Sequence, residues 1–567
     1  MPDQQRNLVL AIIISIVILL GFQYLFPAPS PPPEPAPKAG IEPSATATAP
    51  GAPGQPAPDR PLDRAQTLAA SARLAIEASG GGRLRGSIAL TGARIDDLVL
   101  TDYRETVDPG SPNIVLLSPV GTKAAYYVET GWVAAKDLPV ALPGPDTVWQ
   151  VESDALSPAS PALLRWDNGQ GLVFERRIAL DGDFMFTLTD RVINNRDESV
   201  TLYPYGLINR TGHPELLGYY ILHEGPLGVF GGTLVEVDYD ELEESGSIPR
   251  TSTGGWIGIT DKYWQTALVP AQSEAFDANF RHIPVEGSDK YQVDVRLAER
   301  SVAAGASAES TLRVFAGAKE VTLLDRYQDT LGIARFDRSV DFGWFYFLTK
   351  PLFYVLHHFN GWLGNLGLAI LLLTVIIKLL FFPLANKSYV AMSRLKNLQP
   401  EMLKLRERFP DDRERMNREM MELYRREKAN PLAGCLPIVV QIPVFFALYK
   451  VLFVTIEMRH APFYGWIHDL SGRDPTSLFN LFGLVPWTPP EMLAIGVWPL
   501  AMGVTMFIQQ KLSPAPPDPI QARMMMALPI VFTFLFATFP AGLVLYWTWN
   551  NVLSILQQWL IMRRVRK

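Results

Sequence analysis

The sequence predicts two folds in one chain: a membrane α-helical bundle of six spans, five of them clustered near the C-terminus, plus a large all-β sandwich domain. Long apolar runs at 8–26 and repeatedly after 366 predict the spans. Short runs rich in Val, Ile, Tyr and Phe, separated by turn signals from about Leu84 to Ala318, predict the strands. Residues 64–335 carry 37 acidic and 24 basic side chains, so the rest of a chain with net charge -6 is positive. This uneven charge argues against a nucleic-acid binder with a wholly basic surface.

The N-terminal segment, residues 1–26, is interpreted as a transmembrane anchor. Leu8 to Phe26 is a near-continuous apolar run, and at 1.5 Å per residue its ~19 residues match a bilayer core of roughly 30 Å. A cleavable signal peptide is the competing interpretation, but its apolar region is shorter and ends at a small-residue site. Residues 27–63 follow as a linker rich in Pro and Ala, which cannot bury a core and is expected to be extended.

Residues 64–335 are predicted to form the β-sandwich domain. Asp167-Asn168-Gly169 lies between two strand-like runs and predicts a hairpin turn. More than eight predicted strands favour a large sandwich over a small barrel. The sequence of this region offers no metal-ligand cluster, phosphate loop or nucleophile motif, and the single cysteine, Cys435, rules out an intrachain disulfide. We therefore expect no cofactor and no metal.

The second span is the most informative stretch of the sequence. An amphipathic helix at the membrane interface is expected over 336–351, and the span itself over 352–383. Lys378 lies in its apolar run, with Thr374 one helical turn earlier, and Pro383 is expected to end the run and release the chain into a basic loop. A cation inside a span costs about 2.5–3.5 kcal/mol on insertion scales, so it suggests a function. The alternative is that Lys378 extends its ammonium to the cytoplasmic head groups as an anchor.

Residues 384–433 predict a cytoplasmic helical hairpin. One apolar face repeats every three or four residues, at Leu395, Leu398, Met402, Leu405 and Phe409. Asp411 with Glu414 predicts a capping box that starts the second arm. Residues 387–428 contain 12 Lys and Arg, against two in the loop 457–491. The positive-inside rule then predicts a cytoplasmic hairpin, both termini in the cytoplasm and the β-domain outside.

Residues 434–562 contain the four remaining spans, at Leu436–Ile456, Leu493–Gln509, Met524–Phe539 and Gly542–Ile561, and 563–567 form a basic cytoplasmic tail. Polar residues recur within the spans, namely Thr374, Lys378, Gln441, Gln509, Asn550 and Asn551. Such side chains are unfavourable against lipid, so we expect them to face the bundle interior. Hydrogen bonding between helices is the simplest role for each of them taken alone.

Several long motifs resemble one family. The stretch from Asn430, NPLAGCLPIVVQIPVFFALYKVL, is followed by EMRHAPFYGWIHDLSGRDP, GVTMFIQQKLSP and FPAGLVLYWTWNNVLSILQQWLI. In this order, after an anchor and a large external domain, they resemble the YidC insertases, related to the mitochondrial Oxa and chloroplast Albino proteins. The resemblance implies a bacterial inner-membrane insertase and chaperone with a periplasmic β-domain. Its implied partners are nascent membrane proteins, the lipid bilayer, the ribosome through the cytoplasmic hairpin and the Sec translocon, with no sequence-specific nucleic acid.

The resemblance also implies roles for particular residues. A cytoplasm-open hydrophilic substrate groove would contain Lys378, Thr374, Gln441, Gln509 and Asn550, while the apolar part of a client would contact Phe445, Tyr546 and Trp547. Lys378 stands where many bacterial members carry arginine, so it keeps the charge without the planar fork. Trp547 after Tyr546 departs from the paired tyrosines of some members but keeps an aromatic surface.

Two other classes of function fit the sequence less well. A secondary transporter could use Lys378 in an ion or solute site, but the spans show no inverted repeat or matched pair of broken helices. A membrane enzyme needs a nucleophile or metal set, which the spans do not offer. We therefore expect no catalytic residues.

Overall fold

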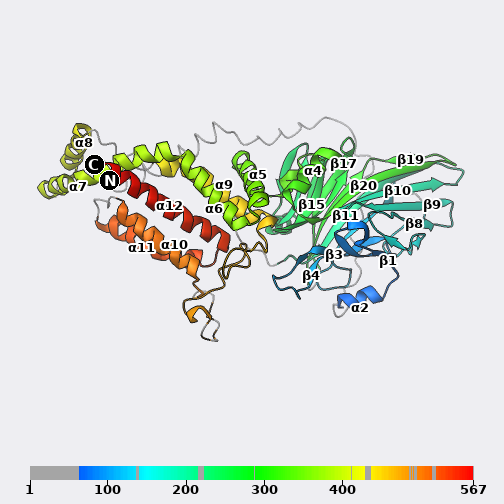
Figure 1. The fold of residues 1–567 in the computed structure, drawn as a ribbon. Coiled ribbons are helices and arrows are strands. Elements are labelled where there is room, and N and C mark those ends of the chain that lie inside the picture. The colour runs from blue at the N-terminus through cyan, green and yellow to red at the C-terminus, as the bar shows by residue number, and fades with distance from the viewer. Residues whose placement is uncertain are drawn as a thin grey trace, which may run out of the picture. The chain divides into compact units, whose positions relative to one another are not determined.

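The computed structural model of the protein describes residues 63–565 apart from 136–139, 215–221, 286–287, 410–411, 428–435, 484, 486, 488, 491–493 and 514–518. The predicted anchor, nearly all of the linker, Cys435 and the last two residues of the basic tail lie outside the described residues. The first described part is the β-domain, in which two large sheets stack face to face (Figure 1). The predicted β-sandwich is thereby confirmed.

The first sheet has eleven strands. Its path runs β14 (Ser247–Thr253), β17 (Ala275–Ile283), β18 (Lys290–Leu297), β11 (Val200–Thr211), β5 (Tyr126–Ala134), β3 (Arg94–Arg104), β2 (Leu84–Ala89), β1 (Arg73–Ile76) and β7 (Ala155–Leu156). β19 (Arg300–Val302) pairs with β11, and β4 (Asn113–Leu117) pairs with β3. The pairs are antiparallel except that β1 and β7 run parallel.

The second sheet has nine strands. Its order is β13 (Thr233–Glu236), β12 (Gly225–Phe230), β15 (Gly255–Thr260), β16 (Trp264–Pro270), β20 (Ser307–Ala318), β10 (Met185–Asn194), β9 (Leu172–Leu180), β8 (Ala162–Asp167) and β6 (Gln150–Val151). Short helices α2 (Arg64–Ala69), α3 (Tyr239–Ser245) and α4 (Val321–Leu331) accompany the sheets. The predicted hairpin turn joins β8 to β9, where the Asn168 N–H donates to the Leu172 carbonyl at 3.1 Å.

A buried arginine links the two sheets. Alternate residues of β9 point into the core because side chains alternate along a strand, and Arg176 takes one of these inward positions with no exposed surface. Its guanidinium makes two hydrogen bonds of 2.6 and 2.8 Å to the Asp190 carboxylate on the neighbouring β10. It also donates to the Thr130 carbonyl on β5 of the other sheet, at 2.7 Å. The charge is therefore paired and hydrogen-bonded inside the sandwich.

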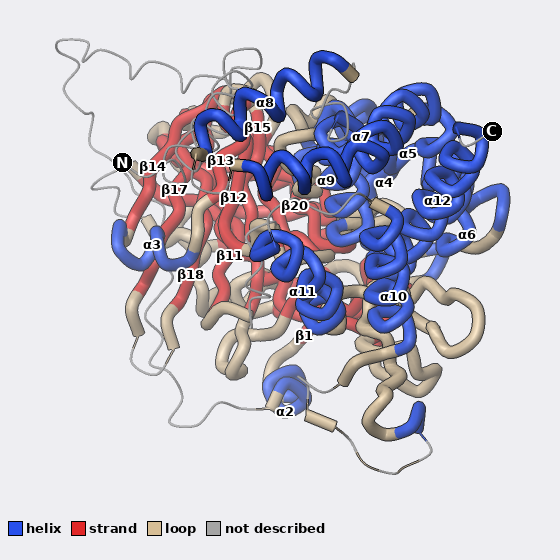
Figure 2. The backbone as a smooth tube through the Cα atoms, turned by 90° about the vertical axis from the view of Figure 1, so that its left-hand side faces the viewer, coloured by secondary structure: helices blue, strands red, loops and turns tan. Residues whose placement is uncertain are grey.

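The second described part is helical. It contains α5 (Tyr346–Leu363), α6 (Leu366–Leu380), α7 (Phe382–Arg408), α8 (Arg413–Arg426), α9 (Leu436–Val454), α10 (Val497–Leu512), α11 (Pro519–Phe536) and α12 (Ala541–Val565). α12 contacts α6, α7, α9 and α10, and α10 contacts α11 (Figures 1 and 2). Among the described residues, no single helix has the length and hydropathy to cross a membrane by itself. The pair α6 and α7, which are joined across a bend of 66°, has the required length and hydropathy when the two helices are taken together. The number of spans stays a prediction.

The start of the helical part differs from the expected boundaries. The helix predicted at 336–351 is instead α5, Tyr346–Leu363, and the second apolar helix begins at Leu366 rather than 352. Gly364 adopts the left-handed conformation that ends α5. The Asn365 side chain then accepts a hydrogen bond of 3.0 Å from the Leu368 N–H and starts α6.

Pro383 does not release the chain into a loop, which corrects the sequence expectation. α6 ends at Leu380, and α7 begins at Phe382 with Pro383 in its first turn. A proline is compatible with this position because the first N–H groups of a helix need no carbonyl partner. The second apolar helix therefore bends sharply and continues as the first arm of the hairpin.

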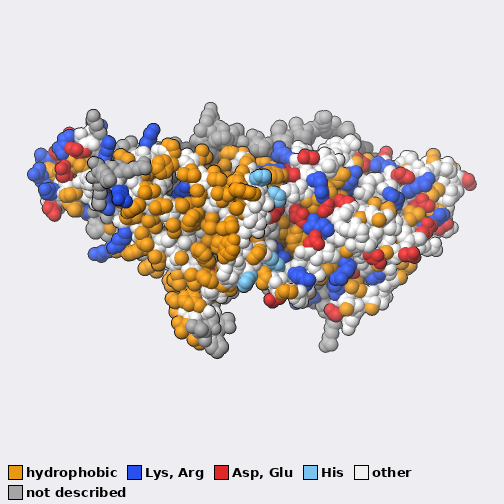
Figure 3. All heavy atoms as spheres, in the orientation of Figure 1, with side chains coloured by type: hydrophobic (Ala, Val, Ile, Leu, Met, Phe, Trp, Pro, Cys, Tyr) orange, Lys and Arg blue, Asp and Glu red, His pale blue; other side chains and the backbone are white. Residues whose placement is uncertain are grey.

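The hairpin of α7 and α8 packs through the predicted face. Leu398 on α7 packs against Leu423 on α8, and both are buried. Half-buried Leu395, Met402 and Leu405 flank this contact. Asp411, the predicted cap, lies outside the described residues; the described cap of α8 is Asp412, whose carboxylate accepts from the Arg415 N–H at 3.0 Å. In Figure 3 charged side chains gather on this hairpin and on the β-domain, while hydrophobic side chains cover the helices between them.

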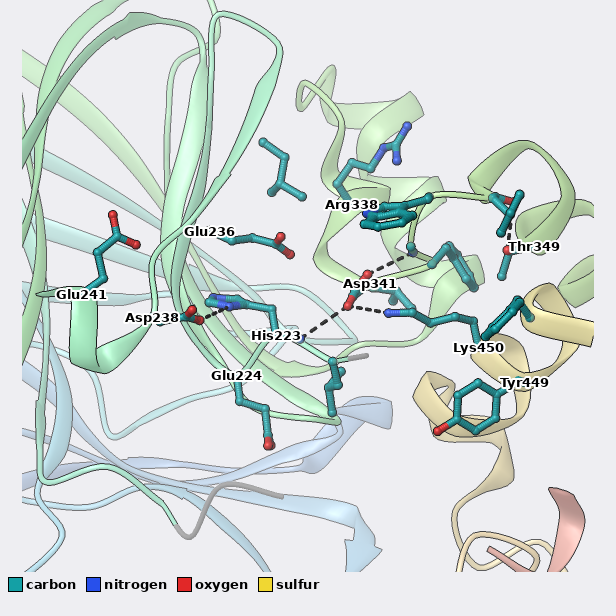
Figure 4. Close-up of a pocket in the computed structure, with 18 of the residues that line it drawn as sticks. His223, Glu224, Glu236, Asp238, Glu241, Arg338, Asp341, Thr349, Tyr449 and Lys450 are labelled. Carbon is teal, nitrogen blue, oxygen red and sulfur yellow. Dashed lines mark hydrogen bonds and ion pairs between the residues drawn. The ribbon is translucent and has the colours of Figure 1, made fainter. Parts of the chain in front are cut away.

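The β-domain contacts the C-terminal end of α9. The Lys450 ammonium on α9 pairs with the Asp341 carboxylate, which precedes α5, at 2.7 Å (Figure 4). Lys262, from the loop between β15 and β16, places its ammonium 4.1 Å from the centre of the Phe453 ring. Beyond α9, burial raises the pKa of the Glu457 carboxyl to about 7. The contacts of Lys450 and Phe453 join the sandwich and the segment before α5 to α9, the helix that carries the predicted site residues Gln441 and Phe445.

Candidate functional site

Lys378 directs its charge between helices. The residue lies near the end of α6, two positions before Leu380, and its side chain is half-buried. Its ammonium donates a hydrogen bond of 2.8 Å to the Ser554 hydroxyl on α12 and one of 3.4 Å to the Gln441 side-chain carbonyl on α9. These contacts direct the ammonium toward α9 and α12.

The two acceptors of Lys378 belong to one polar cluster. The Gln441 amide donates to the Asn550 side-chain oxygen at 2.8 Å, and the Ser554 hydroxyl donates to the Asn550 backbone carbonyl at 2.8 Å. We call Lys378, Gln441, Asn550 and Ser554 the polar cluster. It joins α6, α9 and α12, so its geometry exists only when the three helices are packed.

The sequence pattern did not identify Ser554 as an acceptor for Lys378. A serine within a span carries little signal because its hydroxyl usually bonds the carbonyl one turn earlier, and Ser554 does so with Asn550. The available signal was its spacing. Residues four apart share a helix face, so Ser554 had to lie beside the Asn550 side chain that the sequence had already placed toward the interior.

Three other polar candidates lie apart from the polar cluster. The Thr374 hydroxyl is buried and donates to the Ile370 carbonyl of its own helix at 2.7 Å. Asn551 donates to the Thr505 hydroxyl on α10 at 3.3 Å. Gln509 is half-buried on α10, a helix that contributes none of the cluster's described hydrogen bonds. Thr374 and Asn551 thus fit the simpler role of stabilising helix structure and packing.

The predicted aromatic contacts form a cluster beside the polar one. Phe445 on α9 lies 4.5 Å from Trp547 and 6.4 Å from Tyr546, measured between ring centres. Trp547 packs in turn 4.2 Å from Phe536 on α11. Phe445 and Trp547 are half-buried, whereas Tyr546 is only 3% exposed and packs inside the bundle. In this packing Tyr546 supports the aromatic surface and does not contribute to it.

The ammonium of Lys378 has no carboxylate within ion-pair distance among the described residues. By contrast, Lys350 pairs with Asp325 and Asp337, and Lys450 pairs with Asp341. The neutral oxygens around Lys378 stabilise the ammonium without cancelling its charge. An ammonium has three N–H donors, and the described side chains accept from two of them. In the part of the chain that the structure describes, no cluster of His, Cys, Asp and Glu fits a metal ion.

Comparison with known proteins places this arrangement in a family. Residues 81–355 match the model described as the YidC periplasmic domain, and 358–567 match the model described as 60Kd inner membrane protein. A protein of Methylorubrum extorquens named "Membrane protein insertase YidC" is 50% identical over 100% of this chain and 96% of its own length.

The chain belongs to the YidC family of membrane protein insertases. A relative of the same name from Granulibacter bethesdensis is 50% identical over 99% of this chain and 98% of its own length. A solved structure titled as an active YidC insertase with its first transmembrane domain resolved is 14% identical and covers 83% of this chain and 89% of its own, with a TM-score of 0.36. By the two family models, residues 81–355, which hold most of the β-sandwich, match the periplasmic domain of this family, and residues 358–567, which hold α6 to α12, match its inner membrane protein.

Proposed function

We propose that this protein inserts other proteins into the inner membrane and assists their folding, and that the polar cluster around Lys378 receives the polar segment of a client. The observation that carries the proposal is an ammonium held by neutral oxygens between three apolar helices, without a carboxylate partner among the described residues. Such a group is costly to keep in a membrane. Its arrangement suits a transient anionic partner better than a permanent one.

The mechanism needs no covalent chemistry. A client must move a polar, often acidic, tail across hydrocarbon, and a polar site with a positive charge lowers that barrier by shortening the apolar path and attracting the tail. Lys378 lies close to the bend that leads into α7, so the site is near the cytoplasmic side in the predicted topology. The client's apolar segment would contact Phe445 and Trp547 and then partition into lipid. The membrane potential adds about 2.3 kcal/mol per charge per 100 mV.

The hairpin of α7 and α8 is the proposed contact for nascent chains and ribosomes. It is rich in Lys and Arg, its two arms pack through a small apolar face, and the predicted topology places it in the cytoplasm. The Sec translocon is a second proposed partner, through which the protein would act on clients that it does not insert alone.

The test is reconstitution of the purified full-length protein, alone, into liposomes. A small client with a short acidic external tail is added, and protease protection of the tail measures insertion relative to empty liposomes. Protection above the empty-liposome level is expected. A level equal to that of empty liposomes would contradict insertion by the protein alone and would leave only the role beside a translocon, which co-reconstitution measures directly.

The same vesicles test the transporter alternative. A transporter would move a small solute or ion without any client present. We expect no flux above that of empty vesicles. Solute flux that Lys378→Met abolishes, combined with unchanged insertion, would assign the cation to transport.

A further inference from the structure

A second unusual surface lies in the loop before α10. Residues 475–490, PTSLFNLFGLVPWTPP, contain no charged side chain. We call the described residues of this stretch, 477–483, 485, 487, 489 and 490, the apolar loop. Its described large hydrophobic side chains are exposed by 41–54%: Leu478, Phe479, Leu481, Phe482, Val485 and Trp487. Contiguous exposed apolar surface marks an interaction site more often than a surface facing only water.

Hydrogen bonds connect the described residues of the apolar loop to α10 and to one another. At its base the Asp474 carboxylate accepts hydrogen bonds from the Thr476 N–H at 3.0 Å and from the Trp498 N–H, in the first turn of α10, at 2.9 Å. At its neck the Leu478 N–H donates to the Ile495 carbonyl at 3.0 Å. Within it the Phe482 N–H donates to the Ser477 carbonyl at 2.9 Å. These hydrogen bonds tie the apolar loop to the start of α10.

Two large residues of the loop adopt a strained backbone. Leu481 and Phe482 have φ angles of 50° and 58°, in the left-handed region that non-glycine residues avoid. Such strain persists only where the surrounding structure enforces it. Both side chains are more than half exposed, so burial in the described fold does not compensate for the strain.

The chemistry of the loop selects its partner. The helices beside it continue the same kind of surface, with Val504 on α10 and Ile530 on α11 exposed by 59% and 63%. In the predicted spans these exposed side chains would face lipid. A tryptophan with Phe, Leu and Pro and without charge is typical of a segment at the membrane interface. In Figure 3 the hydrophobic surface of the helices continues without a charged border onto the lower protrusion.

We propose that the apolar loop inserts into the interfacial region of the periplasmic leaflet and anchors the outer end of α10 to lipid. The side of the membrane rests on the topology proposed above, in which the α9–α10 connection is periplasmic. The leaflet would supply the burial that the loop lacks within the fold. Because Asp474 ties the loop to the first turn of α10, the anchor would fix the depth of that helix.

The experiment places a fluorescent probe on the loop. In a Cys435→Ser background, Phe482→Cys is labelled with an environment-sensitive dye, and the full chain is reconstituted into phosphatidylcholine vesicles. Some vesicles contain lipids with a nitroxide near the head group, others lipids with a nitroxide near the chain end. Val504→Cys on α10 is the lipid-facing control, and Val148→Cys, an exposed position of the β-domain, is the aqueous control.

The expected result is a blue-shifted emission at position 482 and a loss of fluorescence that is larger with the shallow nitroxide than with the deep one. Emission like that of the Val148 probe, with quenching by aqueous iodide, would refute insertion. Protection from both nitroxides and from iodide would also refute it, and would indicate a protein partner or a second copy on the loop. Client insertion is measured on the same vesicles, so a failure of the proposed function is seen separately.

Discussion

Replacing Lys378 by methionine should selectively impair clients with acidic tails. Methionine keeps an unbranched, flexible side chain of similar reach and removes only the charge and its donors. In the structure the ammonium has two neutral acceptors, at 2.8 and 3.4 Å, and no described carboxylate partner. A client carboxylate can therefore approach it closely. At an effective dielectric constant of about 20, unit charges interact by about 4 kcal/mol at ~4 Å and about 2 kcal/mol at ~8 Å.

Solvent and salt reduce this attraction, so we expect Lys378→Met to raise the barrier by about 1.4–2 kcal/mol and to slow insertion roughly 10- to 30-fold. The assay compares two otherwise identical clients, one with aspartates and one with asparagines in the external tail, by protease protection over time. Lys378→Met should slow the aspartate client strongly and the asparagine client little.

Two variants serve as matched controls. Lys378→Arg keeps the charge and should retain most of the discrimination, and Ser554→Ala removes one acceptor while leaving the cation in place. Equal slowing of both clients by Lys378→Met would refute the electrostatic role and indicate that Lys378 only stabilises the packing of α6, α9 and α12.

Three further predictions concern the parts around the site. Asp190→Ala leaves the buried Arg176 unpaired between the two sheets and should lower the stability of the β-domain by about 3–5 kcal/mol. Denaturant unfolding of the full chain in detergent measures the change. A change below about 1 kcal/mol would contradict the linking role of Arg176. Burial raises the pKa of Glu457 from 4.5 to about 7, so the folded state binds this proton more tightly than the unfolded state, and stability should fall as pH rises from about 4.5 to 7. Glu457→Gln should remove that slope in thermal unfolding, and an unchanged slope would show that another group causes it. Leu423→Glu places a carboxylate against Leu398 and should open the hairpin. Faster proteolysis between α7 and α8 would show the opening. Glu422→Gln, on the same helix, should leave the proteolysis rate unchanged.

The β-sandwich could be predicted from local pattern because a strand exposes its two faces alternately. The runs around Asp167-Asn168-Gly169 predicted the β8–β9 hairpin, and the structure confirms it. The same pattern did not predict the inward position of Arg176. An arginine inside a core is stable only through Asp190 and the carbonyl of Thr130, and these partners come from other strands.

Boundaries between helices were less predictable. Pro383 ended the expected span but in fact lies in the first turn of α7, and α5 begins about ten residues after the start of the helix expected at 336–351. A proline or glycine has the same local preference whether it ends one helix or starts another, so only the packing of the following segment distinguishes the two outcomes.

The sequence by itself determined that a cation lies within an apolar helix, that polar residues recur in the neighbouring spans, and that the motifs are those of the YidC family. These facts depend on composition and order along one chain. Tertiary structure alone decided that Ser554 and Gln441 are the acceptors of Lys378, that Thr374 bonds its own helix and that Tyr546 is buried. The physical reason is that a hydrogen bond between helices depends on their relative rotation and separation, which the packing of whole helix faces sets.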